Sequence, residues 1–398
     1  MKLSTKARNL RPSPTLTIST RAKQLRADGH KVLDLSLGEP DFPTPTPIRA
    51  AAKDAIDKGY TKYTPSAGIL PLRQRISSFL RERRGLTYGT DQIVVSTGAK
   101  QCLFNAILAL VDPGDEVIIP SPYWVSYPSQ VEIAGGDSVF VETKLEDNFQ
   151  IDPDAIERAI TPYTKLIILN SPNNPTGAIY TKERVEAIAK LAAKKGIWLL
   201  SDEIYDELVY EGAKAHSPFQ LCPEAQEKGI LINGFSKAYA MTGWRLGYIA
   251  APKPLIKAIR AIQGASTSGT NSIAQHAGVA ALDMDRALLE EMRQTFEGRM
   301  LFLREKAKEL PHVKSSSPQG AFYLMLDFSH YLGMQTPSGQ TITSTVDLAT
   351  YLLEQKYVAF VPGEAFGAPG KLRISYATDK DTLAACIDRT TEALKELR

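Results

Sequence analysis

The stretch Asn233-Gly-Phe-Ser-Lys237-Ala-Tyr-Ala-Met-Thr-Gly-Trp-Arg245-Leu-Gly places one lysine among small, aromatic and hydroxyl residues. The apolar runs at 230–232 before it and 248–249 after it are typical of buried strands. A lysine in such a setting should have a lowered pKa, because burial disfavours the charged form of the amine. We therefore expect Lys237 to form a Schiff base and later to act as a base.

Arg245 is the second chemical feature of this stretch. A guanidinium is a planar fork that can hold a phosphate through two parallel hydrogen bonds. The alternative is that Lys237 and Arg245 only flank a strand and pack there, because a short motif is by itself a hypothesis. A reactive lysine, a phosphate clamp and an apolar setting together indicate pyridoxal 5′-phosphate.

The composition is that of an ordinary globular protein of 398 residues, 43% of them hydrophobic and 23% charged. This length predicts two domains, or one large domain with lobes. With a net charge of +3 and no apolar run long enough to span a membrane, neither nucleic acid nor a membrane is an expected partner. Cys102, Cys222 and Cys386 are far apart and the five histidines are isolated, so no metal site is expected.

Strands and helices alternate through the middle of the chain. Strands are predicted at 92–96, 116–119, 138–142, 165–169, 197–200 and 230–232. Short apolar strands separated by helices predict an α/β fold, in which a mostly parallel sheet is covered by helices on both faces. We expect this large domain to comprise residues 46–285.

A smaller α+β domain is expected from the two ends of the chain, residues 1–45 and 286–398. Its C-terminal part should begin with a long charged helix from about 285 to 310, followed by strands and shorter helices. Near the N-terminus, two prolines predict an extended segment over 11–17, because each proline disfavours helix at the residue before it. A helix over 19–28 should follow.

Residues with unusual chemistry follow the predicted strands. They are Gly98, Ala99 and Lys100, then Asn174, then Asp202 with Tyr205, and then Lys237. Because ligands collect at the carboxyl ends of parallel strands, we expect these side chains to meet there. Gly98 and Ala99 also precede a helix, whose free backbone N–H groups favour a phosphate.

Each of these residues has a simpler explanation when it is taken alone. Asn174 is a good turn residue, Asp202 could cap a helix, and Trp124 could belong to the core. A pyridine cofactor, however, needs an anion at its ring nitrogen, donors at its phenolic oxygen, an aromatic face, a phosphate cradle and a lysine. These needs are met by Asp202, by Tyr205 with Asn174, by Trp124, by Gly98 and Ala99 with Arg245, and by Lys237.

A series of longer motifs contains these residues. In order, the motifs are Gly38-Glu-Pro-Asp-Phe, Lys62-Tyr63, Gly98-Ala-Lys100-Gln, Pro122-Tyr-Trp-Val-Ser-Tyr, Asn173-Asn-Pro-Thr-Gly, Ser201-Asp-Glu-Ile-Tyr, Ser236-Lys-Ala-Tyr-Ala-Met-Thr-Gly-Trp-Arg and Arg373-Ile-Ser-Tyr-Ala-Thr. With them the chain resembles the fold-type I pyridoxal phosphate enzymes, and among these the bacterial-type aspartate aminotransferases of the Ib subgroup. The resemblance covers nearly the whole chain, from Pro12 to the last predicted helix.

The resemblance implies a role for each residue of the cofactor site. Lys237 would carry the cofactor as a Schiff base, and Asp202 would keep its ring nitrogen protonated. Tyr205 and Asn174 would hydrogen-bond the ring oxygen, and Trp124 would stack on the ring. The phosphate would be bound by Gly98, Ala99, Ser236 and Arg245, with Lys100 close to the cofactor.

The resemblance also implies a dicarboxylic substrate and a second subunit. The residues implied are Arg373 for the α-carboxylate, with Gly38, Trp124 and Asn174, and Lys100 with Thr15 or Thr17 for the side-chain carboxylate. Tyr63 is expected to reach the phosphate in a neighbouring subunit. This implies an obligate homodimer with shared active sites.

The N-terminal residues 1–27 hold seven Lys or Arg and no acid, which is typical of an organellar transit peptide. In the family that the chain resembles, however, the segment Pro12-Ser13-x-Thr15 belongs to the mature domain, and only a short segment precedes it. A cytoplasmic location is therefore expected. Relatives often carry a lysine where this chain has Arg11, which weighs against a second activity on prephenate.

The expected reaction is transfer of the amino group from L-aspartate to 2-oxoglutarate, giving oxaloacetate and L-glutamate. The first alternative is a prephenate or aromatic aminotransferase with the same scaffold. A pyridoxal phosphate-dependent C–S lyase would need no pair of carboxylate-binding groups and would release pyruvate without an acceptor. A regulator that binds the cofactor would usually carry an appended DNA-binding helix-turn-helix, for which we expect no residues to be left over.

Overall fold

The computed structural model describes residues 3–4, 7–8 and 14–398 of the chain. Its larger sheet has seven strands. In spatial order they are β2 (Ile93–Ser96), β8 (Gly247–Ala250), β7 (Gly229–Gly234), β6 (Trp198–Asp202), β5 (Thr164–Asn170), β3 (Glu116–Ser121) and β4 (Asp137–Glu142). Only β8 is antiparallel to its neighbours, and the other pairs are parallel. The prediction of an α/β fold with a mostly parallel sheet is confirmed.

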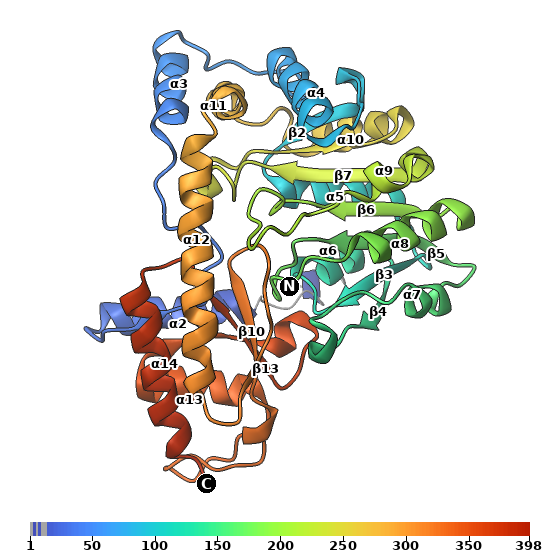
Figure 1. The fold of residues 1–398 in the computed structure, drawn as a ribbon. Helices are drawn as coiled ribbons and strands as arrows, with labels where there is room; N and C mark the ends of the chain where they lie inside the picture. The colour runs from blue at the N-terminus through green and yellow to red at the C-terminus, as the bar shows by residue number, and fades with distance from the viewer. Residues whose placement is uncertain (1–2, 5–6, 9–13) are drawn as a thin grey trace.

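The side chains of this sheet alternate between two hydrophobic cores. In β5, Ile167 and Leu169 belong to one core, and Leu166 and Ile168 belong to the other. This is the period of two that a strand requires, and burial on both faces explains why the strands are continuous apolar runs. The first core is covered by α3 (Thr46–Asp57), α4 (Leu70–Arg84), α7 (Pro153–Ala159), α8 (Lys182–Lys195), α9 (Pro218–Leu221) and α11 (Ser272–Asp283), and the second by α5 (Ala99–Leu110), α6 (Ser126–Ala134) and α10 (Lys253–Ser266) (Figure 1).

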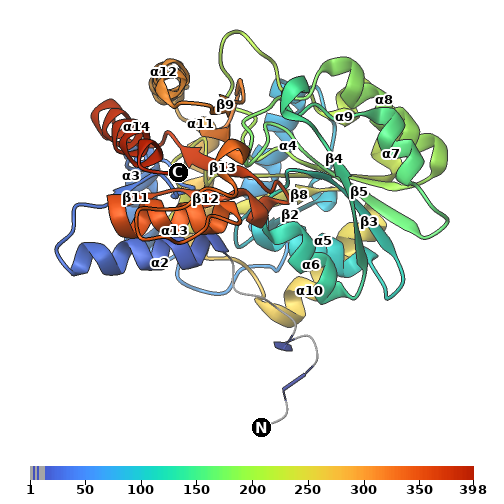
Figure 2. The same ribbon diagram turned by 90° about the horizontal axis from the view of Figure 1, so that it is seen from below.

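A second, smaller sheet is built from the C-terminal part of the chain. Its antiparallel strands are β12 (Val361–Pro362), β13 (Lys371–Ser375), β10 (Tyr323–Asp327) and β9 (Lys314–Ser315), in this order. A separate parallel pair joins β1 (Leu33–Asp34) to β11 (Val358–Ala359). The helices α2 (Pro14–Ala27), α13 (Thr345–Lys356) and α14 (Lys380–Lys395) share one core with these strands (Figure 2). The two ends of the chain therefore pack together, while the boundaries at 45 and 285 stay a prediction.

The long helix predicted from about 285 to 310 is α12 (Ala287–Lys306). It runs from beside the large sheet to the small one (Figure 1). Leu289 near its start belongs to the core of the larger sheet, whereas Met300 and Leu303 belong to the core of the smaller sheet. One helix therefore fixes the two sheets relative to each other.

Some local predictions were wrong. Residues 14–17 were expected to be extended, but α2 begins at Pro14, so Thr15 and Thr17 lie in a helix. A proline is tolerated in the first helical turn, because its missing N–H would have no partner there in any case. Two helices, α10 and α11, were not predicted.

Two negative findings apply to the described part of the chain. None of its helices is long and apolar enough to cross a membrane. It also contains no group of three or more His, Cys, Asp or Glu residues that could hold a metal ion.

Candidate active site

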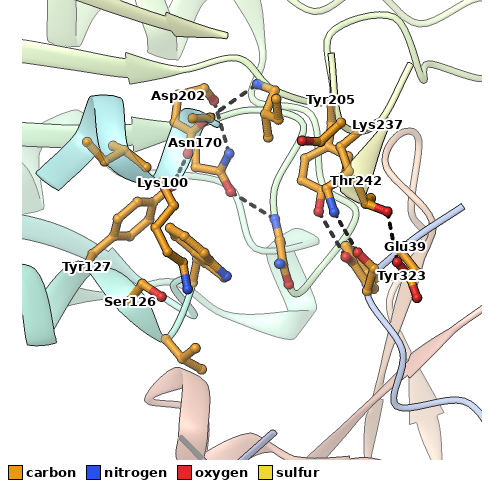
Figure 3. Close-up of a pocket in the computed structure, with 18 of the residues that line it drawn as sticks. Glu39, Lys100, Ser126, Tyr127, Asn170, Asp202, Tyr205, Lys237, Thr242 and Tyr323 are labelled. Carbon is orange, nitrogen blue, oxygen red and sulfur yellow. Dashed lines mark hydrogen bonds between the residues drawn. The ribbon is translucent and has the colours of Figure 1, made fainter. Parts of the chain in front are cut away.

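A cavity of about 420 Å³ lies at the carboxyl ends of β5, β6 and β7. The large-sheet side contributes the starts of α5 and α6 and the turns after β6 and β7. The other side comes from the loop after β1 and from β10 and β13 of the smaller sheet. Lys100, Ser126 and Tyr127 lie across the cavity from Lys237 and Tyr323 (Figure 3). The cavity is therefore shared by segments that are far apart in the sequence.

Lys237 places a partly buried amine in the wall of this cavity. Its Nζ donates a hydrogen bond to the carbonyl oxygen of Gly38 at 2.6 Å. Burial lowers the pKa of Lys237 to about 8. The negative charge of Glu39 acts to raise this pKa, whereas the positive charges of Arg373 and Arg245 lower it further. The prediction that burial lowers the pKa of this lysine agrees with the structure.

Asp202 ends β6, opposite Asn170 of β5. Its carboxylate accepts hydrogen bonds from the hydroxyl of Tyr127 at 2.7 Å and from the backbone N–H of Ile204 at 3.3 Å. Burial raises the pKa of Asp202 to about 6, although these hydrogen bonds oppose the rise. A cation bound next to this carboxylate would offset the cost of burying its charge.

One end of the cavity is suited to a phosphate. Gly98 precedes α5 with a φ of +80°, and a Cβ atom there would lie 2.6 Å from a guanidinium nitrogen of Arg245. Arg245 and the first N–H groups of α5 thus converge, with Ser236 nearby in the cavity wall. Among the described residues, no carboxylate forms a salt bridge with Arg245. A helix start beside a guanidinium without an acid is a favourable place for an anion.

Arg373 is a buried guanidinium with incomplete hydrogen bonding. It donates to the side-chain oxygen of Asn174 at 3.1 Å and to the carbonyl of Ser36 at 2.7 Å. Its Nε is buried without a hydrogen-bond partner, and the residue is only 3% exposed. No carboxylate of the described chain lies within salt-bridge distance of it. Because an unpaired buried charge is costly, Arg373 is best explained as the receptor for an anionic ligand.

Tyr205 and Trp124, which were predicted to contact the ring of the cofactor, also line the cavity. The hydroxyl of Tyr205 lies 2.9 Å from that of Tyr323, and burial raises its pKa well above the ordinary value. Trp124 lines the cavity from the opposite wall, and the Nζ of Lys100 lies 4.9 Å from the centre of its ring. Burial, and then Arg245, lower the pKa of Lys100.

Two predicted residues, Tyr63 and Thr17, do not line this cavity. Tyr63 is fully exposed at 101%, and it lies outside the cavity wall of its own chain. Thr17 is exposed on α2 and does not line the cavity either. Thr15 belongs to the same helix, and Arg11 lies outside the described residues.

Sequence reasoning missed several residues of the cavity wall. Tyr127 is part of a quoted motif, but nothing in the motif showed that it would donate to Asp202. Glu39 accepts a hydrogen bond from Thr242 at 2.8 Å and so connects two other motifs. Tyr323 lies in an apolar strand, where an aromatic residue is typical of a core. Tyr127 could have been included as a candidate because it belongs to a quoted motif, whereas no local sequence pattern marks Tyr323 as a site residue.

The comparisons with known proteins agree with this geometry. Residues 30–389 match the family described as aminotransferase class I and II, so the chain belongs to this family. The chain is 45% identical over 390 residues to an aspartate aminotransferase of Geobacillus stearothermophilus, and the match covers 98% of each chain.

Two further relatives help to define the class. The chain is 44% identical to a bifunctional aspartate aminotransferase and glutamate/aspartate-prephenate aminotransferase of Petunia hybrida, over 100% of this chain and 84% of that one. A solved aspartate aminotransferase from Thermus thermophilus with maleate superposes with a TM-score of 0.92 at 42% identity, covering 99% of this chain and all of the other. The fold of this chain is thus that of the aspartate aminotransferases.

Proposed function

We propose that this protein is an aspartate aminotransferase, which transfers the amino group of L-aspartate to 2-oxoglutarate and gives oxaloacetate and L-glutamate. One observation carries the proposal. The buried guanidinium of Arg373 has no carboxylate partner among the residues that the structure describes, and it faces the same cavity as Lys237. The names of the relatives from Geobacillus and Thermus support the choice of aspartate.

The residues of the cavity fit pyridoxal 5′-phosphate. Arg245 and the start of α5 at Gly98 and Ala99, with Ser236, would hold its phosphate. Asp202 would pair with the protonated ring nitrogen, a cation that would relieve the raised pKa of this buried carboxylate. Tyr205 and Asn174 would donate to the ring oxygen, and Trp124 would cover the ring face. The charged and polar groups of this part of the cavity are thus matched to the groups of one molecule.

The cofactor supplies an electron sink that stabilises negative charge at the substrate Cα. The chain supplies the proton transfer. The Nζ of Lys237 would hold the cofactor, and as the free amine it would take the proton from the substrate Cα and hold it for return. A pKa of about 8 leaves part of this amine neutral near neutral pH, so it can accept a proton.

Two cations would recognise the two carboxylates of aspartate. Arg373 has a fork geometry suited to bind the α-carboxylate, and its buried position prevents it from moving far. Lys100 lies at the start of α5, across the cavity from Lys237 and Tyr323 (Figure 3), and would take the side-chain carboxylate. The contribution proposed for Thr15, Thr17 and Arg11 comes only from the resemblance.

We also propose a homodimer in which Tyr63 reaches the phosphate of the partner subunit. The loop that carries Tyr63 is built to present it. Gln275 donates to Thr64 and accepts from the N–H of Ile69, while the hydroxyl of Ser272 donates to the carbonyl of Tyr60. A fully exposed tyrosine on a loop held this firmly is suited to contact a second copy.

Prephenate is a second candidate substrate. The name of the Petunia relative includes this activity. Lys100 lines the part of the cavity proposed to hold the side-chain carboxylate, and its cation could bind the second carboxylate of this larger substrate as well.

A steady-state assay of purified enzyme with pyridoxal phosphate tests the proposal. Aspartate and 2-oxoglutarate should form oxaloacetate, and the same donor with prephenate or phenylpyruvate should be much slower. Cysteine and cystathionine without an oxo acid provide the control for lyase activity. Release of pyruvate from them at a rate above that of transamination would contradict the proposal.

A further inference from the structure

Tyr323 of β10 lies where three parts of the cavity wall meet. Its hydroxyl is 2.9 Å from the hydroxyl of Tyr205, which follows β6. The guanidinium of Arg373, from the neighbouring strand β13, lies 4.4 Å from the centre of its ring. A Cβ atom added to Gly38 would lie 3.1 Å from the same hydroxyl. One side chain therefore contacts the residues proposed to bind the cofactor ring and the substrate carboxylate.

The direction of the hydrogen bond between the two tyrosines follows from counting hydrogens. Each phenol has one hydrogen to donate. If Tyr205 donates to the ring oxygen of the cofactor, its hydrogen is used, and Tyr323 must then be the donor to Tyr205. Burial raises the pKa of both phenols, so both keep their hydrogens at neutral pH. A hydroxyl that accepts a hydrogen bond becomes a better donor, because bonds in a chain polarise one another.

We propose that Tyr323 is a positioning residue that couples the two binding functions of the site. Its hydroxyl donates to Tyr205 and strengthens the bond from Tyr205 to the ring oxygen of the cofactor, while its ring holds the guanidinium of Arg373 in place for the α-carboxylate. This inference rests on the proposed function. It adds Tyr323 to the residues of the proposed site, although the sequence alone indicated no more than a buried strand at this position.

The charged groups near Tyr205 and Tyr323 are not altered by the substitution that tests this inference. Arg373 faces Tyr323 from β13, Lys237 lies 5.8 Å from the centre of the Tyr205 ring, and Asp202 begins the turn that carries Tyr205. Glu39 lies on the adjacent loop and is exposed. Substitution of Tyr323 by Phe removes one hydroxyl and leaves each of these charges in place.

The test is a pH titration of the visible absorbance of bound cofactor, without substrate, in the holoenzyme. A hydrogen bond to the ring oxygen favours its ionised form and lowers the pKa of the chromophore. Tyr323→Phe should therefore raise this pKa by about 0.5 unit, and Tyr205→Phe should raise it further. In the double variant, removal of the Tyr323 hydroxyl should add no shift to that of Tyr205→Phe, because the first acts only through the second.

The two functions of Tyr323 are separated by a second substitution. Tyr323→Phe keeps the ring, so the KM for aspartate should stay within about twofold, whereas Tyr323→Leu loses the cation–π contact and should raise it about fivefold. An unchanged chromophore pKa in Tyr323→Phe, additive shifts in the double variant, or loss of the cofactor would each overturn the inference. Failure of the parent enzyme to bind the cofactor would instead contradict the proposed function.

Discussion

The turn from Asp202 to Asp206 carries acidic and aromatic side chains that face two separate regions, each of which contains cations. Asp202 and Tyr205 face the cavity, where the cations Lys237 and Arg373 lie. Glu203 and Asp206 instead contact Arg84 at the end of α4, with a distance of 2.6 Å between Arg84 and Glu203. We call Arg84, Glu203 and Asp206 the paired cluster.

The two regions use the same kinds of residues and differ in pairing. The side chains of Glu203 and Asp206 are each 3% exposed and that of Arg84 is 12% exposed, and each has an opposite charge in contact. Arg373 is just as buried, yet none of the described carboxylates pairs with it. A paired buried charge fixes the turn, whereas an unpaired one is kept at a cost to stability and therefore indicates a ligand. Stability should depend on the paired cluster, and activity on the cavity.

The largest effect should come from Lys237, the lysine proposed to react with the cofactor. Lys237→Ala should lower kcat for aspartate by at least about 10⁴-fold, because both the covalent attachment and the proton transfer are lost. The variant should still bind the cofactor, since the phosphate and ring contacts remain. Stopped-flow and steady-state rates would measure this, with the exposed Lys194→Ala at the end of α8 as the matched control. Near-normal turnover would show that another group is the base.

The next largest effect should be on stability, and it should be confined to the paired cluster. Arg84→Leu leaves two buried carboxylates without a cation and should destabilise the protein by about 3–5 kcal/mol. Arg373→Leu removes a buried cation that no described carboxylate neutralises. It therefore leaves no opposite charge unpaired and should destabilise the protein by less than about 1 kcal/mol. Urea unfolding of both variants, cofactor-free and at one protein concentration, measures the difference. Equal losses would show that the two regions do not differ as described.

For activity, the larger effect should come from Arg373→Leu and the smaller one from Arg84→Leu. Arg373→Leu should lower kcat/KM for aspartate about 100- to 1000-fold, through loss of a buried charge-assisted contact with the α-carboxylate. Arg373→Lys keeps the charge without the fork and should recover only part of this loss. Saturation curves with aspartate measure the effect. An unchanged KM in Arg373→Leu would exclude the carboxylate role.

A smaller effect is expected of pH on the rate at which the cofactor becomes attached to Lys237. Only neutral Lys237 reacts with the carbonyl group, so below its pKa of about 8 the rate should rise about tenfold per pH unit, and above it the rate should level off. An ordinary lysine would keep gaining rate up to about pH 10.4. Absorbance of cofactor-free protein after mixing measures the rate, with n-butylamine as the reference amine. A profile that parallels n-butylamine would show that burial does not lower this pKa.

The sequence predicted the larger sheet well, because its elements depend on local patterns. Strands such as β5 and β6 contain continuous apolar runs that end before the polar residues Asn174 and Asp202. Because the carboxyl ends of parallel strands lie at the same edge of the sheet, these residues could be expected to meet there. The start of α2 was predicted wrongly, since proline is compatible with the first helical turn as well as with an extended chain. Local signals of this kind define elements better than they define their ends.

The pairing of side chains from distant elements could not be predicted. The hydroxyls of Tyr205 and Tyr323 meet across 118 positions of sequence, and Arg84 reaches Glu203 across 119. Such contacts depend on how the smaller sheet and α4 pack, which no local pattern specifies. The motifs predicted that Lys237 and Asp202 belong to one site, and both line the same cavity. The residues from other elements that contact them became visible only in three dimensions.

The most direct test of the central claim is a single half-reaction. Aspartate is added to the enzyme loaded with pyridoxal phosphate, without any oxo acid, and absorbance and oxaloacetate are followed together. We expect the visible band of the bound cofactor to disappear while one oxaloacetate forms per subunit, and we expect the band to return when 2-oxoglutarate is added. An unchanged band, or continuous release of product without 2-oxoglutarate, would contradict the assignment of this cavity to amino transfer.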